Sequence, residues 1–159
     1  MKTVLIGLGN PIVSDDAVGI RAVEVLEKEH WEDVDVKIAS VGGMELVEMM
    51  LDYSRAIVVD SILTGKNDVG TVIRITPEDF SESKNISNLH NVGFIQALKF
   101  WSSAGGSVPE HIVIYAMEVE DVSTFSETMT PGVESSLPEL ISRVRDELNG
   151  RNLFSSRLP

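Results

Sequence analysis

The 159-residue chain contains no cysteine, which excludes disulfide bonds, thiolate zinc sites and a cysteine nucleophile. Basic residues are scarce too: 13 lysines and arginines stand against 25 aspartates and glutamates, a formal net charge of −12. Because this charge repels phosphate backbones and anionic lipid surfaces, we expect neither a nucleic acid nor a membrane as partner. The missing cysteines suit a reducing compartment, and we expect a cytoplasmic protein.

Long apolar runs are also missing. No stretch approaches the ~20 apolar residues of a membrane span, and the first apolar run ends in glycines after about five residues, unlike a secretory signal. The length and a hydrophobic content of 43% suit one globular domain with its own core. We therefore predict a single domain over residues 1–150, a C-terminal tail over 151–159, and a monomer.

The order of the expected elements indicates an α/β fold. Strand patterns at 3–6, 34–39 and 56–60 alternate with helix patterns at 15–28 and 44–51, which predicts parallel strands joined by right-handed crossovers. The connection over 61–68 is too short for a crossover helix, so a strand at 69–75 is expected to pair antiparallel to the third. Polar residues 76–88 suggest an irregular segment, followed by a helix, a strand at 111–117, an acidic loop at 117–130 and a helix at 131–148. The expected architecture is a three-layer α/β/α sandwich around a mostly parallel, twisted five-stranded sheet with one antiparallel strand.

The glycine turn after the first strand does not complete a dinucleotide-binding motif. Gly7-Leu-Gly9 begins like G-x-G-x-x-G, but Ile12 occupies the third glycine position. Ser40 stands where an acid would bind the ribose. The chain also lacks a nucleophile elbow, a P-loop and an H-E-x-x-H helix. We therefore predict no nucleotide cofactor, and any hydrolysis must use the acids and the histidines.

Two adjacent carboxylates, Asp15 and Asp16, follow this turn. Acids in the first turn of a helix favour the positive end of its dipole by about 0.3–1 kcal/mol, which is a sufficient role for Asp15. In a doubly wound sheet the first and third strands are neighbours about 4.8 Å apart, with their carboxyl ends at one edge. Asp60 ends the third strand, so the topology brings Asp16 and Asp60 together.

Such a pair of acids needs compensation. Two like charges about 4 Å apart repel by roughly 4 kcal/mol at an effective dielectric constant near 20, and Arg21 is the only basic residue close to either acid in sequence. A proton shared between the two acids or a bound cation would compensate the pair, and a cation is a serious candidate. His90, in a polar loop before the helix near 92–101, would complete a set of two oxygens and one nitrogen. That set suits zinc, nickel or iron with open positions.

Several motifs together resemble the hydrogenase maturation endopeptidases. They are Gly7-x-Gly-Asn-Pro-x-x-x-Asp-Asp-x-x-Gly19, Asp60-Ser61, Ser87-x-x-His90-x-x-Gly93, Gly43-Met-Glu-Leu46 and Met129-Thr-Pro-Gly-Val133. The resemblance runs from residue 1 to about residue 148 and implies a phosphorylase/hydrolase-like fold. Two departures concern Ser40–Gly43, which is shorter and lacks a threonine common in the family, and Asp16, where many members carry glutamate.

The resemblance implies a function and a site. The chain would remove the C-terminal extension of a nickel-iron hydrogenase large-subunit precursor after nickel insertion. Asp16, Asp60 and His90 would bind nickel, which the precursor supplies, although another divalent metal could take its place. These three residues and Asp15, as a general base or as a group that orients the others, are the predicted catalytic residues.

Two alternatives remain. Val4–Pro11 and His90-Asn-Val-Gly93 also resemble peptidyl-tRNA hydrolases, but there the histidine motif follows the turn by about ten residues, and the acidic charge does not suit tRNA. A nickel-binding chaperone or sensor would need the same three ligands as a protease. The sequence does not separate these two classes.

Overall fold

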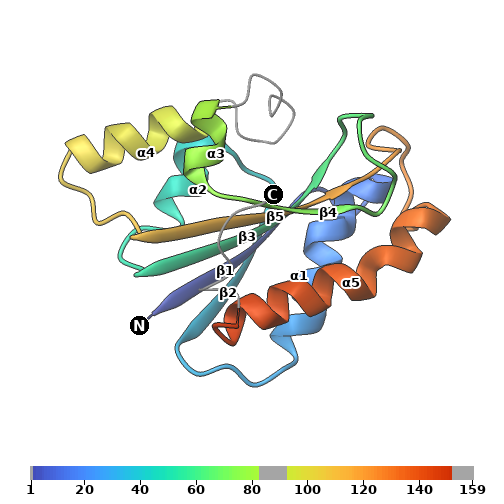
Figure 1. Cartoon of the computed structure of the whole chain (residues 1–159), viewed down its shortest axis with the longest axis horizontal. Helices are drawn as coiled ribbons and strands as arrows, with labels where there is room; N and C mark the ends of the chain where they lie inside the picture. The colour runs from blue at the N-terminus through green and yellow to red at the C-terminus, as the bar shows by residue number, and fades with distance from the viewer. Residues whose placement is uncertain (1, 83–92, 152–159) are drawn as a thin grey trace.

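The computed structural model describes residues 2–82 and 93–151. Five strands form one sheet in the order β2-β1-β3-β5-β4, with every neighbouring pair parallel except β4 and β5. Helices α1 and α5 cover one face of the sheet, and α2, α3 and α4 lie on the other (Figure 1). The predicted three-layer sandwich with one antiparallel strand is confirmed. The strands are β1 (Thr3–Leu8), β2 (Val34–Ala39), β3 (Arg55–Ile62), β4 (Val72–Ile75) and β5 (His111–Glu118); the helices are the 3₁₀ helix η1 (Ser14–Ala17), α1 (Val18–Glu27), α2 (Gly43–Glu48), α3 (Pro77–Glu82), α4 (Phe94–Ser103) and α5 (Pro131–Leu148).

The strands divide their apolar side chains between two cores. Leu5 and Ile57 belong to a cluster with α1 and α5, whereas Ile6 and Val58 belong to a cluster with α2 and α4. This alternation follows from the two-residue period of a strand. All eight residues of β3 are buried, as expected for a central strand that is covered on both faces.

Two strand predictions are wrong in detail. β3 continues two residues beyond Asp60, because β5 pairs with it as far as Ile62↔Glu118. β4 pairs antiparallel with β5 and not with β3. β3 already has β1 on one side and β5 on the other, so β4 can only pair with the far side of β5. The short connection correctly indicated a reversal of direction, but it carried no information about which strand would be the partner.

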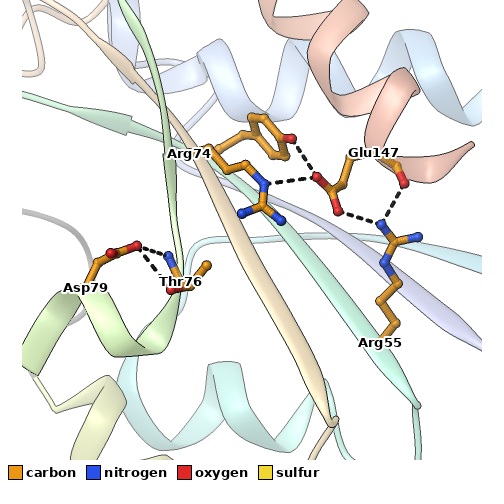
Figure 2. Close-up of polar contacts among 6 residues, drawn as sticks. Arg55, Arg74, Thr76, Asp79 and Glu147 are labelled. Carbon is orange, nitrogen blue, oxygen red and sulfur yellow. Dashed lines mark hydrogen bonds and ion pairs between the residues drawn. The ribbon is translucent and has the colours of Figure 1, made fainter. Parts of the chain in front are cut away.

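Two helix predictions also change. Residues 77–82 form α3 where an irregular segment was expected; Asp79 Oδ2 accepts hydrogen bonds from the Thr76 N–H at 2.7 Å and the Thr76 hydroxyl at 3.1 Å (Figure 2), a capping arrangement. The helix expected from Asp15 begins as η1, whose first turn has no side-chain cap. No helix in the described part of the chain has the length and apolar character of a membrane span.

Candidate functional site

β1 and β3 separate at their carboxyl ends. Pairing between β1 and β3 ends at Gly7↔Val59, while β1 continues beside β2 to Leu8↔Ala39 and β3 continues beside β5. The connections from β1 and from β3 lead to opposite sides of this point. It is the topological switch point of the sheet, at the carboxyl ends of the strands, where open α/β sheets bind ligands.

Two glycines allow the turn after β1 to fold back onto this edge. Gly9 has φ +137°, and a Cβ atom there would lie 1.9 Å from the carbonyl oxygen of Asp16. At Gly19, a Cβ atom would lie 2.3 Å from the carbonyl oxygen of Val59. Larger residues would push η1 and the start of α1 away from the strands. The glycines therefore hold the segment that carries Asp16 against the end of β3.

Asp16 and Asp60 meet at one residue. The hydroxyl of Ser61 donates to Asp16 Oδ1 at 2.9 Å, and the backbone N–H of Ser61 donates to Asp60 Oδ1 at 2.8 Å. Asp60 is fully buried and Asp16 is half-buried. Sequence reasoning placed both acids at this edge but gave Ser61 no role; its position directly after Asp60 was the available signal.

No basic side chain in the described ranges pairs with Asp16. Arg21, the basic residue nearest in sequence, directs its guanidinium to Glu24 Oε2 at 3.2 Å and to the carbonyl of Pro11 at 3.4 Å. Within residues 2–82 and 93–151, Asp16 accepts the bond from Ser61 and forms no ion pair. Its second carboxylate oxygen is therefore available to a ligand.

Asp15 is engaged quite differently from its neighbour. Its side chain is fully buried, and its Oδ1 accepts the N–H of Thr130 at 2.7 Å. Its Oδ2 accepts the N–H groups of Glu120 and Asp121 at 3.2 and 3.0 Å, and the Thr130 hydroxyl lies within 3.0 Å of both oxygens. Instead of capping its own helix, Asp15 binds both ends of the loop between β5 and α5.

His90, the third predicted metal ligand, lies outside the described residues. Within the described residues, no three histidine, aspartate or glutamate side chains form a group that could hold a metal ion, so this part of the chain contains two of the three predicted ligands. Phe94, which begins α4 four positions after His90, belongs to the same core cluster as Val58 and Ile62. By strand alternation these two residues share a face with Asp60.

A cavity of about 630 Å³ opens at the opposite end of the sheet, where the parallel strands begin. Its lining includes Arg55 and His111, the first residues of β3 and β5, together with Arg74 and Glu147. Because it lies at the amino ends of the parallel strands, it is remote from Asp16 and Asp60. His111 lines this cavity and does not belong to the acid pair.

A buried ion cluster borders this cavity. Glu147 accepts hydrogen bonds from Arg55 at 2.6 Å, from Arg74 at 3.1 Å and from the hydroxyl of Tyr115 at 2.7 Å (Figure 2). Burial of Glu147 favours its protonated form, but the bonds from Arg74, Tyr115 and Arg55 outweigh burial and lower the pKa of Glu147. The pKa of Tyr115 is raised, mainly by burial and secondly by the hydrogen bond to Glu147. Because the buried Glu147 binds Arg55, Arg74 and Tyr115 at once, this cluster has the character of a structural element.

Comparison with known proteins identifies relatives of the whole fold. The family model described as "Hydrogenase maturation protease" matches residues 20–147, a range that includes Asp60 and His90 and begins after Asp16. The hydrogenase 2 maturation protease of Escherichia coli K12 is 26% identical over 150 residues, covering 91% of this chain and 88% of the relative. The hydrogenase expression/formation protein HupD of Rhizobium leguminosarum is 28% identical over 145 residues, covering 88% and 70%.

Solved structures agree with this result. The hydrogenase maturating endopeptidase HybD from Escherichia coli superimposes with a TM-score of 0.79 at 25% identity, over 95% of this chain and 94% of that one. The [NiFe] hydrogenase maturation protease HybD from Thermococcus kodakarensis shares the fold, with a TM-score of 0.71 at 18% identity over 93% and 99% of the two chains. The comparisons thus favour the first of the two resemblances seen in the sequence.

Proposed function

Because this chain belongs to the hydrogenase maturation protease family, we propose that it is an endopeptidase that removes the C-terminal extension of a nickel-iron hydrogenase large-subunit precursor after nickel insertion. In this proposal nickel arrives as part of the substrate. Asp16, Asp60 and His90 engage it, so that cleavage depends on a loaded precursor.

The observation that carries the proposal is the pair of acids joined by Ser61. Two carboxylates at the switch point each accept a hydrogen bond from this single residue, and Arg21 is turned toward Glu24 and Pro11. Carboxylate oxygens together with an imidazole nitrogen suit a first-row divalent metal. The donor set therefore fits nickel, and the exposed part of Asp16 supports access from solvent.

Each residue has a distinct task in the proposed reaction. Asp16 and Asp60 position the precursor by binding its metal, and Ser61 fixes the orientation of both carboxylates. A divalent metal in this position supplies Lewis-acid polarisation of a carbonyl or of a water molecule. Asp15 acts by positioning, because its carboxylate oxygens already accept hydrogen bonds from the loop between β5 and α5.

The test is the intact mass of a purified precursor after incubation with this protein. Each large-subunit precursor encoded in the same genome is tested in nickel-loaded and nickel-free form. We expect loss of one C-terminal peptide from the loaded form alone. A nickel-binding chaperone or sensor is the alternative class, favoured by the same three ligands; it would bind metal or precursor and leave the mass unchanged.

Substitutions test the site separately from the reaction. Asp16→Ala, Asp60→Ala and His90→Ala should each abolish cleavage of the loaded precursor, with circular dichroism confirming that the variants are folded. Asp146→Ala is the matched control, since this acid is only partly buried, pairs with Arg151 and lies on α5, away from the acid pair. Normal turnover by all three site variants would refute the assignment of the site.

A further inference from the structure

The loop over residues 119–130 is fixed at both ends and in its middle. Asp15 holds the two ends through the N–H groups of Glu120, Asp121 and Thr130. In the middle, the Ser126 N–H donates to the carbonyl of Ile12 at 3.0 Å, and its carbonyl accepts the N–H of Ser14 at 2.9 Å. Figure 1 shows this connection beside the start of α1. The loop is therefore tied to the turn that carries Asp16.

This fixed loop presents apolar side chains to solvent. Phe125 is 83% exposed, and Ile12 on the adjoining turn is 49% exposed. Ile12 and Phe125 directly precede the two residues of the parallel bridge Val13↔Ser126, so they stand side by side on the two joined segments. We name this surface the Ile12–Phe125 face. Single exposed apolar residues are common, but two side by side on a hydrogen-bonded frame form a ready contact site.

The two segments that form the Ile12–Phe125 face carry acidic side chains and no basic ones, and Arg21, whose guanidinium reaches the carbonyl of Pro11, is itself paired with Glu24. Glu120 and Glu127 are exposed on the loop, and neither residues 119–130 nor residues 10–16 contain a lysine or an arginine. A partner with basic side chains would be attracted to this surface and an acidic one repelled. The large exposed ring suits an apolar side chain of the partner.

The Ile12–Phe125 face also adjoins the candidate site. The N–H of Asp16 donates to the carbonyl of Val13 at 3.0 Å, so one turn of η1 separates Asp16 from the face. The Ile12–Phe125 face therefore lies next to the segment that carries Asp16.

We propose that the Ile12–Phe125 face binds the segment of the hydrogenase precursor next to the scissile bond, a segment with a large apolar side chain and at least one lysine or arginine. This inference rests on the proposed function and adds the means of substrate recognition. Phe125 and Ile12 contribute affinity, whereas Glu120 and Glu127 attract the basic residue.

The test compares Phe125→Ala with Phe100→Ala. Phe100 is 55% exposed on α4, so the two variants remove the same ring from different surfaces. The dissociation constant for nickel-loaded precursor is measured in the background of Asp60→Asn, and KM and kcat are measured without that substitution. We expect Phe125→Ala to raise both the dissociation constant and KM at least ~10-fold with kcat within about twofold. Phe100→Ala should leave all three unchanged, and Glu120→Gln with Glu127→Gln should weaken the salt dependence of binding.

The outcomes separate this inference from the proposed function. If the precursor is cleaved and Phe125→Ala matches Phe100→Ala, the face is not a docking site and the protease function stands. If the precursor binds in a Phe125-dependent manner but is never cleaved, the face stands and the protease function falls. If the precursor neither binds nor is cleaved, both are overturned.

Discussion

The adjacent acids Asp15 and Asp16 should respond in opposite ways to the same substitution. In Asp15→Asn, one carboxylate oxygen becomes an NH₂ group, which must face either the N–H of Thr130 or those of Glu120 and Asp121. Each buried donor left without an acceptor costs about 1–3 kcal/mol, and the remaining bonds lose their charge assistance, so the free energy of unfolding should fall by about 2–5 kcal/mol. Asp16→Asn keeps its acceptor for Ser61 at a half-buried position and should cost less than about 1 kcal/mol.

Urea unfolding followed by far-UV circular dichroism measures this difference, with both variants compared with the unsubstituted protein. Hydrogen exchange should show lost protection at the amides of residues 120, 121 and 130 in Asp15→Asn and retained protection in Asp16→Asn. Precursor cleavage should be abolished in Asp16→Asn. A fully stable Asp15→Asn that has lost cleavage would refute the positioning role and make Asp15 a participant in the chemistry.

Four further predictions follow from contacts elsewhere in the fold. Glu147→Gln weakens the bonds to buried Arg55 and should lower the free energy of unfolding by about 3–5 kcal/mol, whereas Glu139→Gln, which breaks an exposed pair, should change it by less than about 1 kcal/mol. Since the folded state lowers the pKa of Glu147 from 4.5, its stabilisation is full above that pH and is lost as the pH falls through the folded pKa; Glu147→Gln should flatten the acid side of a pH–stability curve, and an unchanged slope would contradict the cluster. Gly19→Ala places a Cβ 2.3 Å from a strand carbonyl and should destabilise the protein by several kcal/mol in the same urea assay, roughly the upper range for a single substitution. Ser61→Ala should slow precursor cleavage roughly 10-fold with little loss of stability, because it removes one of the two bonds that orient the acids; an unchanged rate would exclude that role.

Hydrophobic periodicity and the rules of α/β topology predict most of the fold and the approach of Asp16 to Asp60. Burial patterns identify the βαβαβ unit, and the rule that ligands bind at carboxyl ends beside a switch point predicts that Asp16 approaches Asp60. Ser61, which donates a hydrogen bond to each of the two acids, shows why that rule works here: the two segments that carry the acids are ones that local sequence patterns already describe.

Local sequence patterns do not predict contacts between residues that are far apart in the sequence. The partners of Asp15 are 105 to 115 positions away in sequence, and Arg55 meets Glu147 across 92 positions. Such contacts depend on which elements become neighbours in the sheet and its layers. For the same reason β4 could be recognised as a reversed strand while its partner, β5, could not.

The rate of precursor cleavage as a function of nickel occupancy tests most directly whether Asp16 and Asp60 act on the metal of the substrate. A nickel-iron hydrogenase large-subunit precursor is prepared at occupancies from empty to full, and intact mass follows the loss of its C-terminal peptide with the unsubstituted protein and with Asp16→Asn. We expect a rate proportional to occupancy with the unsubstituted protein and no cleavage with Asp16→Asn. Equal rates at all occupancies, or equal rates with the two proteins, would contradict the claim that these acids act on the metal of the substrate.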